Sequence, residues 1–327
     1  MKTKKILILA ASIFMCFNVF ARDAFFSNTE YEIKVSYNDK AFPGDAVFVK
    51  MRFIELNKAA KHQLNKTEAK MILTVNDKKA DTANFYILPK ETNRSTVTFL
   101  CGIPLSSWWT ENDKLTLTVK YNIYGQEEME FTLPFQLEHK DFVVEEIPLD
   151  EKNSAIKTDT SQKRMEQIEK LNAILATINP QDVYETRPFK QPVDCTRLTS
   201  FFGDRRTYRY TNGKKSTNLH YGIDYGVPTG TNVYACGEGK VVLAEERITT
   251  GYSVVIEHLP GLYSLYYHMD KINVKVGDKV NQGTLLGQSG CTGLATGPHL
   301  HWEIRLNMSA VSPDFFKGDF TQSLVVD

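Results

Sequence analysis

The stretch TGPHLHWEIR, residues 296–305, places two of the chain's seven histidines, His299 and His301, two positions apart. It ends in an apolar and aromatic run that is typical of a β-strand. Because alternate residues of a strand project from the same face, both imidazoles are expected on one side of it. Two histidines on one strand face make this strand the first candidate for a functional site.

A second polar pair lies upstream in HYGID, residues 220–224, where Gly222 and the following YGVP argue against a helix. In an extended segment, His220 and Asp224 share a face and can offer a nitrogen and an oxygen to one metal ion. A catalytic zinc ion takes three protein ligands and leaves one position for water. His220, Asp224 and one histidine of the HLH pair complete such a set, and spacing does not decide which one.

The histidine left over from the pair would lie beside the metal-bound water, where it could act as a general base or as a donor. His268, in YYHM, supplies a second group of this kind from another predicted strand. His62, His139 and His258 are interpreted as structural or solvent-facing.

Around these motifs, the region from about residue 185 to the end is rich in glycine and reads as β-structure with almost no helical signal. The predicted strands are TNVYAC, GKVVLAEER, YSVVIEH, YSLYYHM, GTLLGQS and LHWEIRL. The glycine-rich loops SGCTGLATG and PTGTN are expected to wall a groove for an extended peptide, since glycine permits close backbone approach.

Residues 30–139 alternate between apolar and polar positions and contain frequent turn signals. The seven predicted strands are YEIKVSY, AVFVKMRF, AKMILTVN, ANFYILP, STVTFL, KLTLTVKYNIYG and MEFTLPFQLE. Seven short strands in about 110 residues favour an immunoglobulin-like β-sandwich, although a small barrel would show the same pattern.

Between the two β regions, residues 139–160 are polar and charged and are predicted to be a linker. The next stretch, SQKRMEQIEKLNAILATINP, has helical periodicity, with Thr160 or Ser161 as its N-cap and Asn179-Pro180 at its end. Its apolar face carries Met165, Ile168, Leu171, Leu175 and Ile178. This helix is interpreted as a strut between the domains.

The first 21 residues combine a basic start, an apolar run of 15 and a small residue before a cut, which predicts a secretory signal peptide cleaved after Ala21. A retained anchor and lipidation at Cys16 are the alternatives. The predicted organisation is therefore a signal peptide (1–21), a β-sandwich (22–142), a linker with an amphipathic helix (143–184) and a mainly β carboxy-terminal domain (185–327).

The composition excludes some partners. Lys plus Arg and Asp plus Glu are both 39, so the net charge is zero and favours neither a nucleic-acid nor an anionic-membrane partner. After removal of the signal peptide, Cys101, Cys195, Cys236 and Cys291 remain, with no CxxC or CxxH spacing, so a cysteine zinc site is not expected. Disulfides among the last three and buried free thiols both stay open, and oligomeric state is unreadable.

At these residues the chain resembles the M23 family of zinc metallopeptidases, the LytM or lysostaphin-type endopeptidases. The likeness covers residues 185–320 through TSFFGDRR, HYGIDYGVPTGTNVYACGEGKVV, GYSVVIEHLPGLYSLYYHM, VKVGDKVNQGTLLGQSGCTG and TGPHLHWEIR. It implies that His220, Asp224 and His301 bind Zn²⁺ and that His268 and His299 are the catalytic histidines. The chain departs from the family pattern at Cys195, Cys236 and Cys291, and a disulfide between two of them would stiffen the groove.

The resemblance further implies hydrolysis of peptides in bacterial peptidoglycan, with DD-endopeptidase action on direct cross-links as the default, in the periplasm or cell envelope. Without an HExxH glutamate, proton transfer falls to His268 or His299, and their division of roles is open. The alternatives are a non-catalytic LytM-type regulator of other cell-wall hydrolases, from which the metal ligands are missing, and a peptidase autoinhibited by its amino-terminal region.

Overall fold

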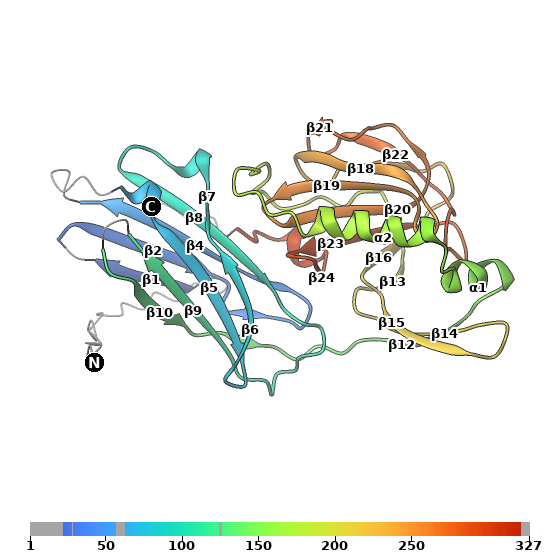
Figure 1. Cartoon of the computed structure of the whole chain (residues 1–327), viewed down its shortest axis with the longest axis horizontal. Helices are drawn as coiled ribbons and strands as arrows, with labels where there is room; N and C mark the ends of the chain where they lie inside the picture. The colour runs from blue at the N-terminus through green and yellow to red at the C-terminus, as the bar shows by residue number, and fades with distance from the viewer. Residues whose placement is uncertain (1–21, 28, 57–62, 124–125, 322–327) are drawn as a thin grey trace.

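The computed structural model describes residues 22–27, 29–56, 63–123 and 126–321, and it consists mainly of β-strands arranged in two domains (Figure 1). The predicted signal peptide, Cys16 and His62 lie outside the described residues. Within these ranges, no helix has the length and apolar character needed to cross a membrane.

The amino-terminal domain is a sandwich of two antiparallel sheets, as expected from the alternating pattern. One sheet contains β1 (Arg22–Ser27), β2 (Tyr31–Tyr37), β4 (Ala46–Glu55), β8 (Thr96–Pro104) and β7 (Tyr86–Ile87). The other contains β10 (Met129–Leu133), β9 (Leu115–Asn122), β5 (Glu68–Val75) and β6 (Lys78–Asn84). Short strands β3 (Lys40–Ala41) and β11 (Gln136–Leu137) pair in parallel beside them.

The seven predicted stretches of this domain all contain strands, whereas β1 and β6 were not predicted. Strand β9 shows why the alternation of apolar and polar residues predicted these strands, because its residues are alternately buried and half-buried along its whole length. Strand β6, KKADTAN, has no buried residue, so no hydrophobic pattern marks it. Single 3₁₀ turns follow at Leu64–Lys66 and Pro89–Glu91, and a third lies at Phe315–Lys317.

The segment predicted to be a linker contains regular structure. Strand β12 (Val144–Pro148) and helix α1 (Glu151–Thr158) precede α2 (Gln162–Leu175), which begins after Ser161, whose hydroxyl accepts the N–H of Arg164 at 3.3 Å. The interpretation of α2 as a strut between the domains is wrong. Leu171, Ile174 and Leu175 pack on the carboxy-terminal sheet instead (Figure 1).

The carboxy-terminal domain is built on a ten-stranded antiparallel sheet. Its main path is β13 (Leu198–Ser200), β16 (Gly222–Tyr225), β23 (Leu300–Leu306), β20 (Leu262–Ile272), β19 (Gly251–Leu259), β18 (Gly239–Arg247) and β21 (Lys279–Val280). Strands β17 (Asn232–Tyr234), β22 (Leu285–Ser289) and β24 (Ser309–Val311) flank it. A separate three-stranded sheet joins β12 of the linker to β14 (Arg205–Arg209) and β15 (Lys215–Leu219).

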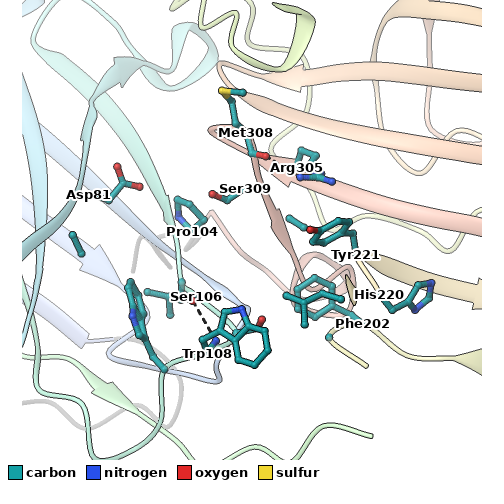
Figure 2. A pocket seen from close by; sticks show the side chains of 17 residues that line it. Asp81, Pro104, Ser106, Trp108, Phe202, His220, Tyr221, Arg305, Met308 and Ser309 are labelled. Atoms are coloured by element: carbon teal, nitrogen blue, oxygen red, sulfur yellow. Dashed lines mark hydrogen bonds between the residues drawn. The ribbon is translucent and has the colours of Figure 1, made fainter. Parts of the chain in front are cut away.

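The two domains share part of their core. Phe48 of β4 is fully buried, and its ring lies 5.3 Å from that of Phe320 and 6.0 Å from that of Phe316. Two polar contacts add to this packing: Asn307 Nδ2 donates to the Gly102 carbonyl at 3.1 Å, and the N–H of Ser312 donates to the Gly44 carbonyl at 2.7 Å. Next to this contact the domains border a pocket between them (Figure 2).

The four described cysteines are free thiols. The disulfide considered among Cys195, Cys236 and Cys291 is therefore absent from this structure. Cys236 is fully buried beside His258, and Cys101 is fully buried in the sandwich core, which matches the interpretation of buried thiols for these two.

Candidate metal centre

The sheet register brings the two histidine motifs together. Strand β16 pairs antiparallel with β23, and Asp224 lies directly opposite His301 in that pairing. Gly222 permits the close approach of the strands, because a Cβ at this position would lie 2.3 Å from the carbonyl oxygen of Trp302. His220 precedes β16, and its backbone N–H donates to the Asp204 carbonyl at 2.9 Å.

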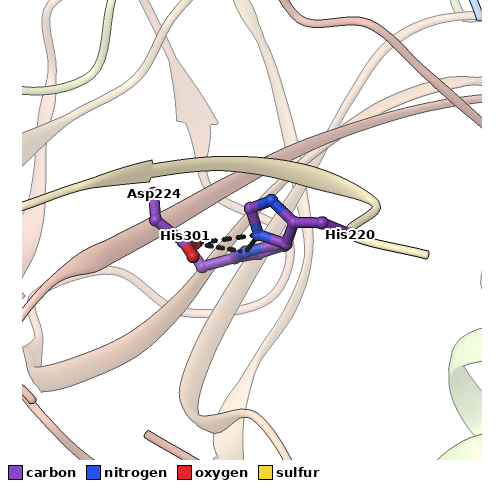
Figure 3. Close-up of side chains that lie close together, drawn as sticks. All are labelled: His220, Asp224 and His301. Carbon is purple, nitrogen blue, oxygen red and sulfur yellow. Dashed lines mark hydrogen bonds and ion pairs between the residues drawn. The ribbon is translucent and has the colours of Figure 1, made fainter. Parts of the chain in front are cut away.

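The side chains of His220, Asp224 and His301 point toward one another (Figure 3). Asp224 Oδ1 lies 3.0 Å from His220 Nε2 and 2.8 Å from His301 Nδ1, and the two ring nitrogens are 3.0 Å apart. Ligand atoms of a tetrahedral zinc ion lie about 3.3 Å from one another, given metal–ligand distances of about 2.0–2.1 Å. The three atoms are therefore close to the spacing that one bound cation requires.

The positions of the protons favour a cation in the same place. His220 Nδ1 lies 2.8 Å from the carbonyl oxygen of Phe201, which can only accept, so Nδ1 carries the proton and Nε2 presents a lone pair. His301 Nε2 faces the Glu303 carboxylate at 3.5 Å, which favours the proton on Nε2 and a lone pair on Nδ1. Three acceptor atoms thus converge, and His, Asp, His is a donor set that zinc binds.

Electrostatics at the site agree with this description. Burial raises the pKa of Asp224, but His220 and His301 outweigh burial and hold that pKa well below its usual range. Burial lowers the pKa of His301, but its hydrogen bonds to Asp224 and Glu303 outweigh burial and raise that pKa to about 9. The Asp224 and Glu303 carboxylates therefore favour positive charge beside them, which either a proton on His301 or a bound metal ion would supply.

His268 and His299 lie beside the three-residue cluster, and their rings are 4.8 Å apart. Both direct Nδ1 at a backbone carbonyl 2.8 Å away, of Thr292 for His268 and of Gly297 for His299. Nδ1 must therefore be the donor in each ring, and Nε2 is left as an acceptor on the side of the cluster. His299 Nε2 lies 3.8 Å from Asp224 Oδ1, so His299 and His301 share a strand face as predicted.

The position of His268 depends on a local backbone irregularity. Its φ is 59°, and the β19–β20 register shifts at this point, which is a β-bulge. A bulge re-aims a side chain relative to regular pairing, and bulges are common beside active sites. Burial, together with the nearby His299 and His301, lowers the pKa of His268 to about 3, so this imidazole is neutral at pH 7.

Arg206 is a further site residue that the sequence did not reveal. Its guanidinium donates to Asp224 Oδ2 at 3.1 Å and to Glu145 Oε1 of β12 at 2.7 Å. Asp224 thus keeps Oδ1 for the cluster while Oδ2 is held by Arg206, as outer partners commonly hold metal ligands. Neither β12 nor β14 was predicted, and although Arg206 ends the stretch TSFFGDRR of the family resemblance, no role was assigned to it there.

A groove of about 670 Å³ lies over the cluster, and His220, Asp224, His268, His299 and His301 all line it. Residues 294–299 form one wall, in agreement with the expectation for the loop SGCTGLATG. The loop PTGTN, residues 228–232, does not contribute to the lining, so that expectation was wrong. The linker supplies another wall through Glu145, Ile147, Leu149 and Lys157.

Two of the histidines interpreted as structural lie away from the groove. His258 is fully buried, with Nδ1 2.7 Å from the Glu238 carbonyl and Nε2 2.7 Å from Ser264 Oγ. His139 is on the surface between Glu111 and Asp141.

A buried His, Asp, His cluster with two free imidazoles, placed in a groove on an antiparallel sheet, is typical of a metal-dependent hydrolase. Residues 218–313 match the family model described as peptidase family M23, and this range includes all five of these residues. The chain therefore contains a peptidase family M23 domain.

Curated relatives match part of the chain. The chain is 42% identical to the peptidoglycan DD-endopeptidase ShyA of Vibrio cholerae serotype O1 over 116 residues, 35% of this chain and 26% of that protein. It is 37% identical to the DD-carboxypeptidase/endopeptidase Mpg of Neisseria meningitidis serogroup B over 123 residues, 38% of this chain and 27% of that protein. The chain spans between a quarter and a third of the length of these relatives.

A solved structure of a peptidase M23 protein from Pseudomonas aeruginosa matches 85% of this chain and 95% of its own chain. The TM-score is 0.53 and the sequence identity is 20%, so this likeness concerns the fold. It extends over both domains, whereas the family model matches residues 218–313.

Proposed function

We propose that this protein is a zinc-dependent endopeptidase that hydrolyses peptide cross-links of bacterial peptidoglycan, and that it acts as a DD-endopeptidase. The observation that carries the proposal is the convergence of His220 Nε2, Asp224 Oδ1 and His301 Nδ1 at the floor of the groove. The names of the relatives from Vibrio and Neisseria, peptidoglycan DD-endopeptidase and DD-carboxypeptidase/endopeptidase, support the substrate class.

In this proposal His220, Asp224 and His301 hold the zinc ion, which would polarise the scissile carbonyl and acidify a bound water. The chain's own contribution is to hold these groups and to move protons. His268 and His299 each direct Nδ1 at a backbone carbonyl, which leaves Nε2 of either ring to accept the proton of the attacking water and return it to the leaving amine. Once Nε2 has accepted that proton it becomes a donor, and the exclusion of bulk water by the groove walls would strengthen its hydrogen bond to the developing oxyanion.

The location of the substrate sets the proposed location of the enzyme. Peptidoglycan lies in the cell envelope, so the protein must be carried across the inner membrane, and the signal peptide predicted at residues 1–21 would provide the route. We place the mature chain in the periplasm or at the cell envelope, without stable membrane insertion.

The test uses purified full-length protein on isolated peptidoglycan, with separation of the released muropeptides. We expect new free amines and loss of cross-linked dimers, and both should stop after chelation and in His301→Ala. His139→Ala, which removes an exposed histidine far from the groove, is the matched control and should cleave normally. Cleavage that survives chelation, or that His301→Ala leaves intact, would contradict the proposal.

Autoinhibition is the second candidate, and the linker supplies a specific observation for it. Asn153 of α1 is buried, and its Nδ2 donates at 3.3 Å to the carbonyl of Ala295 in the loop that walls the groove. If this contact restricts the groove, intact protein will cleave slowly and Asn153→Ala will cleave faster. Equal, measurable rates would exclude autoinhibition through α1. If neither protein cleaves, the non-catalytic regulator of other cell-wall hydrolases is the remaining alternative.

A further inference from the structure

The pocket between the two domains has a volume of about 450 Å³ and has walls from both of them (Figure 2). The sandwich contributes Ala80, Asp81 and the segment Pro104–Trp109. The peptidase domain contributes Phe202, Gly203, residues 219–221, Arg305 and residues 308–310. Nothing described so far gives this interdomain pocket a function.

Its most exposed large aromatic side chain is Trp108, which is 66% exposed although it is held firmly in place. The guanidinium of Arg205 stacks on the indole at 3.9 Å from the ring centroid, and Arg205 Nη2 donates to the Ser107 carbonyl at 2.5 Å. These contacts tie a loop of the sandwich to β14 of the peptidase domain. A large apolar surface is thus kept open to solvent rather than folded away, which is typical of a binding site.

Polar groups flank the aromatic surface. Asp81 lies on the sandwich wall and Arg305 on the opposite wall (Figure 2). Arg305 stacks over the ring of Tyr221 at 4.7 Å, so a second, half-exposed aromatic ring is also held in position. The pocket therefore offers aromatic faces together with one acid and one base, and it carries no excess of either charge.

The interdomain pocket adjoins the groove over the candidate metal centre. Leu219, His220 and Tyr221 line both of them, and His220 is one of the three clustered site residues. The packing of Phe48 against Phe316 and Phe320 fixes the domains on either side. A substrate that occupies the groove can extend past Tyr221 into a second, preformed subsite.

We propose that the interdomain pocket binds sugar rings of the glycan strand to which the cleaved peptide is attached. Pyranose rings present C–H faces that stack on indole and phenol rings, and their hydroxyl and acetamido groups pair with carboxylate and guanidinium groups. An uncharged sugar suits balanced walls, whereas a stem peptide with several carboxylates would favour a basic surface. This inference rests on the proposed function, since it assumes a peptide carried on glycan.

The test measures binding apart from cleavage. Full-length protein is kept metal-free with a chelator and titrated with a soluble, uncharged oligosaccharide of N-acetylhexosamines, and in parallel with sugar-free stem peptides. The chain has three tryptophans, and Trp302 is fully buried. Trp108 and Trp109 both line the pocket, so we expect glycan to shift the emission of this pair and to protect it from acrylamide, with a smaller response in Trp108→Phe, and the peptides to leave both signals unchanged.

Variants locate the site by calorimetric titration with the same glycan. Trp108→Ala should weaken glycan binding by about tenfold, as is common for a central aromatic contact, while Trp108→Phe should retain most of it. Phe25→Ala, which removes an exposed aromatic residue from β1 outside the pocket, should bind as wild type does.

The binding results decide the glycan subsite independently of the muropeptide assay, which decides the proposed peptidase activity. Glycan binding that depends on Trp108 supports the subsite even if the muropeptide assay shows no cleavage. Absence of glycan binding, equal binding by Trp108→Ala, or a Trp108 response to sugar-free peptide alone would overturn the subsite, even if the protein cleaves peptidoglycan.

Discussion

His268 and His299 differ from the three clustered residues in a way that mutation can separate. Their Nδ1 atoms are held by the carbonyls of Thr292 and Gly297, and they are not needed to complete the His, Asp, His set. We expect His268→Ala and His299→Ala to lower kcat by about 10²–10⁴-fold, the usual contribution of a general acid or base, and to keep bound zinc. Elemental analysis and muropeptide kinetics on the same samples measure both.

His301→Ala is the comparison for these variants, and it should lose the metal together with the activity. Loss of zinc in His268→Ala would instead make that residue a ligand. A change confined to KM would place either histidine in substrate binding rather than in proton transfer.

Glu257 provides a pH dependence that is independent of the metal centre. Burial and the nearby Asp182 raise its pKa from 4.5 to about 7. The folded state therefore binds this proton more tightly than the unfolded state, so the stabilisation is complete below pH 4.5 and is lost as the pH rises through about 7. We expect the free energy of unfolding of Glu257→Gln, minus that of wild type, to increase over this interval in denaturant titrations.

Subtraction is needed because other groups titrate in the same interval. Burial lowers the pKa of His258 to about 4, so its contribution to stability changes in the opposite direction with pH. Glu245→Gln, on the neighbouring β18, is the matched control. A flat difference curve for Glu257→Gln would show that Glu257 ionises in the folded protein as it does in the unfolded chain.

Single residues also mark how far the sequence could be interpreted. Strand periodicity predicted that His299 and His301 share a face, and both do lie against Asp224. The choice of His301 as the ligand came from family resemblance, and it is consistent with the 2.8 Å contact to Asp224. The partner of His220 Nδ1 is a backbone carbonyl, at Phe201, and the sequence carries no signal for such a partner.

Strand β14 carries two arginines that pair with the linker strand β12. Arg206 also contacts the candidate metal centre, whereas Arg209 lies at the surface. Arg206 bonds Asp224 and Glu145, whereas Arg209 pairs with Glu146, which also pairs with Lys215. We expect Arg206→Ala to lower zinc affinity by about tenfold, because Asp224 loses the group that orients it. Competition with a chromogenic chelator measures this affinity.

Arg209→Ala is a close control, because it also removes an arginine from β14 and breaks an ion pair with β12, the one between Arg209 and Glu146. Its zinc affinity should equal that of wild type. If both variants bind zinc as wild type does, or if Arg206→Ala binds it more tightly, Arg206 does not support Asp224.

The elements that sequence patterns missed are those whose order depends on distant partners. Strand β12 lies in a charged segment, and it exists because residues 144–148 pair in parallel with β14. In contrast, the boundaries of GKVVLAEER and LHWEIRL coincide with those of β18 and β23. Buried and half-buried residues alternate along most of β18, and nearly every residue of β23 is buried. A local pattern of apolar residues predicts a buried strand, whereas no local pattern predicts the pairing of a polar strand with a distant partner.

The arrangement of the whole molecule depends on contacts that span more than 200 residues. The aromatic cluster of Phe48 with Phe315, Phe316 and Phe320 joins the sandwich to the last turns of the peptidase domain. No sequence pattern linked Phe48 to these carboxy-terminal phenylalanines. Their shared burial makes the proposed glycan subsite a fixed feature, because its two walls cannot separate without exposing this cluster.

Unfolding experiments can test that coupling. Wild type should unfold in one calorimetric transition, and Phe48→Ala, which removes the sandwich's contribution to the cluster, should lose about 3–5 kcal/mol of stability and unfold in two. Phe53→Ala is matched in size and burial and lies in the interior of the sandwich core, so it should lower the single transition without splitting it. One transition in Phe48→Ala would mean that the remaining interdomain contacts, at Gly44, Gly102 and Ser107, suffice to couple the domains. Two transitions in wild type would mean that the walls of the interdomain pocket move independently.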